Sequence, residues 1–161
     1  MHINSYPAVF AVGHGAILDI FDGDVVVEEK IDGSQFSFGF LEGEWRCRSK
    51  NKEIILDAPE KMFTSAVDTV RGLSVQPGWI YRTEYLEKPK HNTIVYSRTP
   101  LKNLIVFDIQ TGLEQYLNPE EKAFEAARLG LECVPCLFKG KIESLDEFKK
   151  LLDEMSILGG S

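Results

Sequence analysis

The stretch VVVEEKIDGSQFSFGF, residues 25–40, places charged residues between two segments that look like strands. It begins with a β-branched run and ends with phenylalanines at every second position, and both patterns are typical of strands. The residues between them are Glu28, Glu29, Lys30, Asp32 and Gly33. Charged side chains are seldom buried unless they are paired or used. The stretch therefore predicts either a solvated hairpin or a reactive lysine with its surroundings.

Further strand and helix patterns lie on both sides of this stretch. The segment LEGE, residues 41–44, is typical of a turn that closes a hairpin. Strands are predicted at residues 45–50, 53–56, 79–86, 93–97, 103–109 and 132–138, and helices at 58–73, 118–130 and 144–160. Asn118 with Glu121, and Ser144 with Glu147, have the spacing of helix capping boxes. This order predicts one α+β domain, residues 1–161, built on an antiparallel sheet.

The composition is that of a globular protein, with 161 residues of which 43% are hydrophobic and 27% charged. No apolar run approaches the roughly 18 residues of a membrane span, and no basic leader precedes an apolar segment. We therefore expect a cytoplasmic protein without a membrane partner. Cys133 and Cys136 form a C-x-x-C pair inside an apolar run, which favours a strand in the core over a metal site.

The charge is unevenly distributed along the chain. The net charge of −7 argues against extensive binding to nucleic acid, which relies on Lys and Arg. Residues 46–103, however, hold 11 Lys and Arg against 6 Asp and Glu. A basic middle segment permits a local face that binds phosphate. An ordinary fluctuation of surface charge explains it equally well.

Lys30 is the residue best suited to covalent chemistry. A lysine shielded from water can act as a nucleophile, because burial disfavours the charged ammonium. We therefore expect its amine inside a cleft, among carboxylates and apolar neighbours. Alternation along a strand would put Glu28 and Lys30 on one face and point Glu29 away. Alternatively, the three are the solvated end of an edge strand, where lysine discourages further pairing.

Several motifs in order resemble those of a known enzyme superfamily. VVEEKIDGSQFSFG resembles the first motif of the covalent nucleotidyltransferases, which include DNA ligases, RNA ligases and capping enzymes. CRSKNKEI, YRTEYL and LIVFDIQTG are similar to its later motifs and follow in the same order. The resemblance is greatest to phage-type, ATP-dependent RNA ligases that seal nicked duplex RNA. It also covers LEKPKHNTIVYSRTP, which includes His91 and Asn92, residues to which we assign no chemistry.

The resemblance implies a role for each matching residue. Lys30 would attack the α-phosphorus of ATP to give lysyl-AMP, and the AMP would pass to an RNA 5′-phosphate before a 3′-hydroxyl seals the nick. Glu84 would hold the ribose and Phe107 would stack on the adenine. Either Glu28 or Glu29 would contact the adenine edge, since strand alternation favours the first and the family pattern the second. The remaining implied contacts are Ile31 and Lys50 with the nucleotide, and Gln35 and Arg48 with RNA.

Two features depart from the family pattern. The second motif usually carries Ser-Arg, whereas here Ser49 precedes Lys50, which lacks the planar fork of arginine. The family also has a later Glu-Gly strand for a divalent metal and a final Lys-x-Lys strand, and neither follows Phe107. KGK at 139–141 has the right letters, but we interpret it as a polar turn after the strand 132–138. Mg²⁺ is implied as a cofactor, but no residue is assigned as its ligand.

These departures leave alternatives to a self-sufficient RNA ligase. We expect the N-terminal portion of an adenylyltransferase domain, either truncated or completed by a second polypeptide that supplies the missing motifs. One alternative is a catalytically incomplete fragment that binds a nucleotide or a partner chain. Others are a DNA ligase or a GTP-dependent capping enzyme, which share the first motif. If the chain is phage-encoded, the host cytoplasm is its expected location.

Overall fold

The computed structural model describes residues 2–7, 23–142, 145–151 and 156–159. Within these residues the main sheet has seven strands in the order β4-β3-β2-β5-β6-β7, with β8 beside β6. Its strands are β2 (Ser34–Leu41), β3 (Glu44–Ser49), β4 (Glu53–Ile54), β5 (Ile80–Tyr85), β6 (Leu104–Gly112), β7 (Gln115–Tyr116) and β8 (Glu132–Cys133). Neighbouring strands are antiparallel except for the parallel pair β6 and β8. The predicted α+β class with a mostly antiparallel sheet is confirmed.

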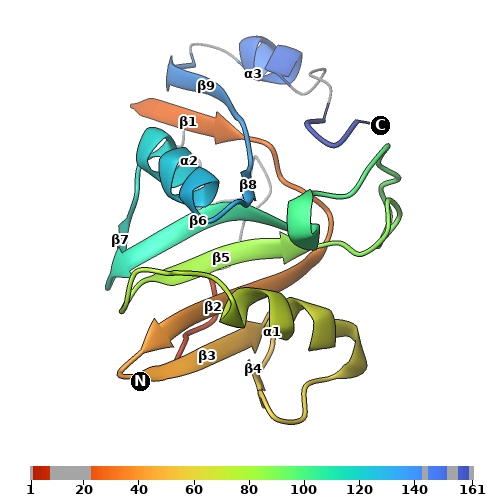
Figure 1. Cartoon of the computed structure of the whole chain (residues 1–161). Helices are drawn as coiled ribbons and strands as arrows, with labels where there is room; N and C mark the ends of the chain where they lie inside the picture. Colours follow the sequence, from red (N-terminus) through yellow and green to blue (C-terminus); the bar gives the residue numbers. More distant parts are fainter. Residues whose placement is uncertain (1, 8–22, 143–144, 152–155, 160–161) are drawn as a thin grey trace.

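A separate two-stranded sheet carries the start of the VVVEEK segment. It pairs β1 (Asp24–Glu28) with β9 (Cys136–Lys141), antiparallel. In Figure 1 this pair lies beside α2 (Pro119–Arg128), at the end of the molecule opposite the β2–β3 hairpin. The chain leaves β1 at Glu28 and enters the main sheet at Ser34, so residues 29–33 connect the two sheets.

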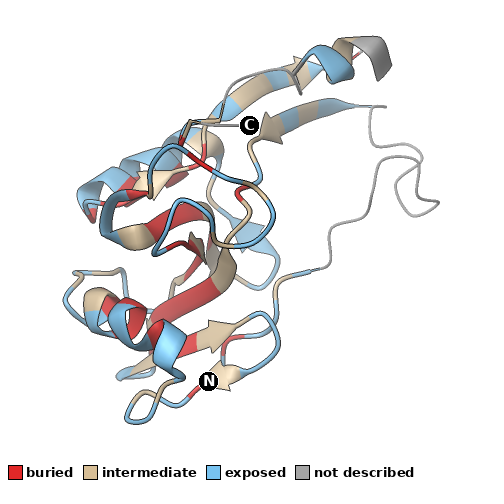
Figure 2. Cartoon of the chain, turned by 90° about the vertical axis from the view of Figure 1, so that its right-hand side faces the viewer, coloured by how far each residue is buried: buried red, intermediate tan, exposed pale blue. Residues whose placement is uncertain are grey.

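The β2–β3 hairpin forms as the sequence predicts. Glu42 and Gly43 both have positive φ, 52° and 82°, which is the backbone of a two-residue hairpin turn. Of the alternating phenylalanines, Phe36 and Phe38 are fully buried and Phe40 is half-buried at the end of the strand. Figure 2 shows that the buried residues are concentrated in the central strands.

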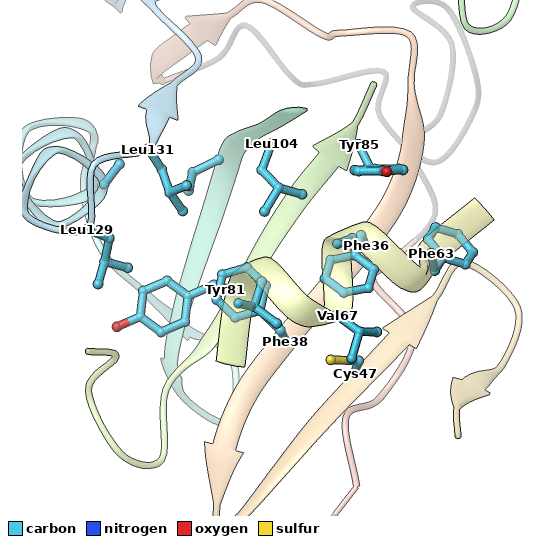
Figure 3. Close-up of a cluster of buried hydrophobic side chains, with 14 of the residues drawn as sticks. Phe36, Phe38, Cys47, Phe63, Val67, Tyr81, Tyr85, Leu104, Leu129 and Leu131 are labelled. Atoms are coloured by element: carbon cyan, nitrogen blue, oxygen red, sulfur yellow. The ribbon is translucent and has the colours of Figure 1, made fainter. Parts of the chain in front are cut away.

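Two helices cover one face of the main sheet and form the apolar core with it. α1 (Thr64–Arg71) follows a 3-10 turn at Lys61–Phe63, and α2 begins at Pro119. The capping box predicted at Asn118 and Glu121 is present. Figure 3 shows aromatic side chains of β2 and β5 packed against these helices, with Phe38 stacked on Tyr81 at 5.2 Å. None of the helices in the described part of the chain is long and apolar enough to span a bilayer.

The predicted C-terminal helix is only partly right. Within the described residues α3 spans Leu145–Leu151, so a helix is present where expected, but it does not extend to residues 156–159. Residues 156–159 form a turn instead, because the carbonyl of Leu158 accepts hydrogen bonds from the backbone of Ser97 and Arg98. The capping box predicted at Ser144 and Glu147 lies outside the described residues.

Three other predictions from the sequence are corrected. Residues 93–97 are not a strand but a loop with one isolated bridge, because the backbone N–H groups of Thr93 and Ile94 bind the carboxylate of Asp32 instead of a ladder. The KGK segment at 139–141 is not a turn but the end of β9, paired with Asp24–Val26. Of the C-x-x-C pair, Cys133 lies in β8 and packs half-buried against the core as predicted, whereas Cys136 lies in β9 and is exposed, so the prediction is wrong for Cys136.

Candidate active site

A cleft of about 840 Å³ opens on the face of the main sheet that α1 and α2 do not cover. Most of the residues that the sequence singled out line it: Lys30, Glu28, Glu29, Ile31, Gln35, Lys50, Glu84 and Phe107. They come from the 29–33 connection and from β1, β2, β5 and β6, together with the loop after β3. Arg48 is not among the residues that line the cleft and lies in β3 opposite Ser37.

Lys30 lies at the mouth of the cleft. It lines the same cavity as Glu84 and Phe107, and its positive charge lowers the pKa of the Glu84 carboxyl. The side chain is nevertheless exposed, so the prediction of a buried amine is wrong. The alternation argument also fails, because β1 ends at Glu28 and the next residues are irregular. Glu28, Glu29 and Lys30 therefore all reach the cleft.

A β-bulge in β6 turns two side chains into the cleft. Arg82 pairs with Asp108 and Thr83 pairs with Val106, so Phe107 is the extra residue. Such a bulge changes the alternation of the strand and re-aims side chains. As a result Phe107 and Asp108 both line the cleft, whereas Val106 and Ile109 on either side belong to the apolar core.

Glu84 is a partly buried carboxyl group in the floor of the cleft. Burial raises its pKa to about 7, and this effect exceeds the opposing attraction of Lys30 and a hydrogen bond from the backbone of Gly33. Carboxyl groups with strongly shifted pKa values in a cleft are candidates for function. At neutral pH both protonation states of Glu84 are populated, so it can donate or accept a hydrogen bond.

The turn after Lys30 is held by the loop at residues 92–96. The Asp32 carboxylate accepts hydrogen bonds from the backbone of Thr93 and Ile94 at 2.9 and 3.0 Å. These bonds, that from Ile94 above all, lower the pKa of Asp32. The Tyr96 hydroxyl accepts from the Asp32 backbone at 2.8 Å. Asn92, in the segment without assigned chemistry, donates to the carbonyl of Gly33 at 2.8 Å and so completes the clamp.

Gly33 is required in this turn by space. A Cβ at this position would lie 2.7 Å from Cδ1 of Leu86 and 2.8 Å from the carbonyl oxygen of Tyr85. Real Cβ atoms essentially never come this close, so a larger residue would displace the turn from β5. The D-G pair thus fixes the connection that carries Lys30.

The two neighbouring glutamates have different partners. Glu28 accepts a hydrogen bond of 2.5 Å from the ammonium of Lys122, a residue of α2 that is 3% exposed. Glu29 accepts a hydrogen bond of 2.8 Å from the backbone of Ile157 through Oε1. The carboxylate of Glu28 is therefore held by a buried cation, and that of Glu29 by a backbone group.

Sequence reasoning missed the contribution of residues 2–7. Tyr6 and Pro7 line the cleft, and the Tyr6 hydroxyl donates to Asp108 at 2.6 Å. The ring of Tyr6 meets Phe107 edge-on, 5.0 Å between centroids. Burial raises the pKa of Tyr6, which keeps this hydroxyl protonated. No motif or periodicity in residues 2–7 signals these contacts.

Arg82 was also missed. It is 1% exposed beneath the cleft face and donates to Ser37, to Gln110 and to the carbonyl of Asn4. Burial lowers its pKa. It stands two residues before Glu84, so strand alternation in β5 could have placed both on one face.

Comparisons with known proteins identify the family and the fold of the chain. The family described as RNA ligase matches residues 23–158. A solved structure from Aquifex aeolicus, assigned as an ATP-dependent DNA ligase, superimposes with a TM-score of 0.60 at 21% identity. The match covers 92% of this chain and 41% of the other. At this identity the likeness shows the fold alone. No curated protein matches.

Proposed function

The chain belongs to the RNA ligase family, and we propose that its cleft binds ATP and that Lys30 becomes covalently linked to AMP. The observation that carries this proposal is the meeting of Lys30, Glu84 and Phe107, from three separate segments, in one cleft. Each of the three has the chemistry that the corresponding step needs. An amine attacks phosphorus, a carboxyl group holds hydroxyls, and an aromatic ring stacks on a base.

The proposed first step is nucleotidyl transfer to the protein. The Nζ atom of Lys30, after losing a proton, attacks the α-phosphorus, a P–N bond forms, and the P–O bond to pyrophosphate breaks. An exposed amine at the cleft mouth is accessible to the triphosphate. Lys50, also exposed and lining the cleft, supplies positive charge for the leaving group. Such transfers depend mainly on positioning and electrostatic stabilisation.

The bound nucleotide would be oriented by the floor of the cleft. Phe107 stacks on the adenine, a contact that every base tolerates, and Tyr6 supports the ring from its edge. Glu84 binds the ribose hydroxyls. Ile31 is 1% exposed and supplies an apolar wall.

Glu29 is the better candidate for reading the adenine edge. The carboxylate of Glu28 is already bound by the buried ammonium of Lys122. Glu29 accepts from a backbone N–H through one oxygen, Oε1, and lines the cleft. Its second oxygen is then available to accept a hydrogen bond from the exocyclic amine of adenine.

The later steps, by the same proposal, act on RNA. The AMP passes to a 5′-phosphate, and an adjacent 3′-hydroxyl displaces it. Gln35 lines the cleft beside Glu84 and would contact the RNA end there. Arg48 lies outside the cleft lining, so any contact it makes with RNA would be beyond the nucleotide pocket. The chain spans 41% of the ligase structure that it resembles. The proposal therefore includes further residues, in the same or a second polypeptide, that supply the missing motifs.

Mg²⁺ is proposed to enter with the phosphates of ATP. No group of three or more His, Cys, Asp or Glu side chains able to hold a metal exists among the described residues. The described residues therefore do not fit a metal site made by protein alone, although Mg²⁺ commonly binds through substrate phosphates and one or two carboxylates.

Incubation with α-labelled ATP and Mg²⁺ tests the proposal. The wild type should become labelled, Lys30→Ala should not, and Lys52→Ala should label like the wild type. Lys52 is a matched control because it is an exposed lysine close to the cleft residue Lys50 in the sequence. It does not line the cleft itself, and it pairs with Glu60, which also lies outside the cleft. Labelling by GTP instead would indicate a capping-type enzyme. Absence of label in all proteins would contradict the proposal and favour a fragment that only binds a nucleotide or a partner.

The choice of nucleic acid is tested separately. The adenylylated protein should pass its label to the 5′-phosphate of nicked duplex RNA in preference to a DNA nick of the same sequence. Equal or greater transfer to DNA would contradict the RNA assignment without affecting the nucleotide chemistry.

A further inference from the structure

Lys122 is a buried charged residue that the proposed chemistry does not use. It lies in the first turns of α2, is 3% exposed, and is not among the residues that line the cleft. Lysine is almost never fully buried unless it is paired, because removing an ammonium from water is costly. Its contacts therefore indicate what it is for.

The ammonium of Lys122 joins two segments that carry the site. It donates to Oε2 of Glu28 at 2.5 Å and to the carbonyl oxygen of Phe107 at 2.9 Å. Glu28 is the last residue of β1, two positions before Lys30. Phe107 is the extra residue of the β6 bulge, whose backbone is not paired in the ladder with β5. One side chain thus satisfies that carbonyl and holds the end of β1.

The bridge from Lys122 is important because β1 is not a strand of the main sheet. It pairs only with β9, whereas Glu84 and Phe107 stand on strands of the main sheet. Ladder hydrogen bonds therefore do not fix the distance between Lys30 and Phe107. The Lys122 bridge ties Glu28, two residues before Lys30, to Phe107, and the weaker 3.4 Å contact from the Glu29 backbone to Pro135 assists it. The turn at Asp32 and Gly33 holds the chain on the other side of Lys30.

The base of the bridge is itself rigid. Asn118 and Glu121 cap α2 reciprocally at 2.8 and 3.1 Å, and Pro119 stands at its first position. Lys122 follows Glu121 directly, so its Cα is fixed by the capped turn. Buried ion pairs often contribute no more to stability than well-packed apolar residues of similar volume, so stability alone does not account for this pair.

We propose that Lys122 is a positioning residue. Through Glu28 and the Phe107 carbonyl, it sets the position of the Lys30 amine relative to the Phe107 ring, on which the adenine would stack. This inference rests on the proposed function. The bridge should affect the rate of AMP transfer more than the affinity for ATP. The residues that would hold the nucleotide remain in the cleft when the bridge is removed. A displacement of about 1 Å at a reacting group can reduce the rate about 100-fold.

The test compares Lys122→Met and Glu28→Gln with the wild type in single-turnover labelling at saturating ATP. Each variant should label about 10- to 100-fold more slowly, with the dissociation constant for ATP changed less than about threefold. Because Glu28→Gln weakens the bridge that Lys122→Met removes, the double variant should be no slower than the slower single one. Urea denaturation of each variant establishes that it is folded.

Arg128→Met provides the matched control on the same helix. Arg128 pairs with Glu125 at 2.6 Å, and Glu125 also accepts from Tyr81, on the core side of the sheet. This variant should lose stability because Glu125 stays buried, yet it should label at the wild-type rate once folded. If Lys122→Met also loses stability and labels at the wild-type rate, its role is merely structural and the inference is overturned.

A second readout separates this inference from the proposed function. Modification of Lys30 by an amine-reactive reagent, followed by mass spectrometry, reports whether bound ATP shields the amine. ATP should protect Lys30 in the wild type and fail to do so in Lys122→Met at saturating ATP. If Lys30 of the wild type is neither labelled nor protected, the proposed function itself fails. If Lys30 of both proteins is equally protected and labelled, only the positioning role fails.

Discussion

The two faces of the main sheet are built from the same strands but from different chemistry. On the helix side the alternate residues Tyr81 and Tyr85 of β5 are packed in the apolar core. On the cleft side Arg82 and Glu84 of the same strand are polar and largely removed from water. Alternation along β5 determines which face of the sheet a residue occupies. The residue type then distinguishes the apolar face that stabilises the fold from the polar face that lines the cleft.

Buried polar groups distinguish the cleft face from the helix face. Removing a charge from water is unfavourable unless it is paired or bonded. The cleft side accepts this cost at Arg82 and Glu84, each held by specific partners. Natural sequences break the rules of stability chiefly where function requires it. Substitutions on the two faces should therefore separate stability from nucleotide binding.

The largest expected difference in the effect of a substitution is between two phenylalanines on opposite faces of the sheet. Phe38→Ala should lower the free energy of unfolding by about 3–5 kcal/mol, because it leaves a cavity beside Tyr81. Phe107→Ala should cost less stability, since Phe107 is only half-buried, but weaken ATP binding by about 1–3 kcal/mol through lost stacking. Urea denaturation and equilibrium ATP binding measure the two effects. Equal losses of stability with unchanged ATP affinity would remove the distinction between the faces.

Glu84 should make the cleft side sensitive to pH. Its pKa is raised to about 7, so between about pH 4.5 and 7 the folded state holds a proton that the unfolded state has lost. Stability should therefore fall as pH rises through this window. Glu84→Gln should remove this fall and, at pH 8, be more stable than the wild type by an amount on the order of 2 kcal/mol.

Denaturation curves from pH 4 to 8 measure the effect. The same Glu84→Gln variant should bind ATP less tightly, because a carboxylate accepts hydrogen bonds from hydroxyls better than an amide does. Parallel stability profiles for the wild type and the variant would show that Glu84 is not desolvated in the folded protein.

A smaller effect is expected at Asp32. Asp32→Asn should reduce stability by about 1 kcal/mol, because the charged oxygens accept from Thr93 and Ile94. The pKa of Asp32 is lowered in the fold, so this contribution is complete above the unfolded value of about 3.9 and disappears as pH falls through the lower folded value. Asp68→Asn, at an exposed position of α1, is the control and should leave stability at pH 7 nearly unchanged. A constant difference between wild type and Asp32→Asn down to pH 2 would contradict the argument.

Much of the apolar face could be predicted from the sequence. The period of Phe36 and Phe38 and the Asn118 cap are local signals, and the structure confirms both. Features set by distant contacts were missed or wrong. Residues 93–97 have strand-like composition, yet their N–H groups are bound by Asp32, which lies about sixty residues earlier in the chain.

The candidate site was predictable to a similar degree. Ordered motifs named the residues that line the cleft, because those motifs record chemistry rather than folding. The exposure of Lys30, the bulge at Phe107 and the bridge from Lys122 depend on how two sheets meet. No local pattern in the sequence records that geometry. The turn at 156–159 was mistaken for helix because its backbone partners, Ser97 and Arg98, are equally remote.

The most direct test of the central claim is to locate AMP on the protein. Wild-type protein treated with ATP and Mg²⁺ is digested, and the modified peptide is sequenced by mass spectrometry. The cleft described above predicts AMP on Lys30 and on no other lysine, with Lys50 unmodified although it lines the same cavity. AMP on Lys50 or on any residue outside the cleft would contradict the assignment of Lys30 as the nucleophile.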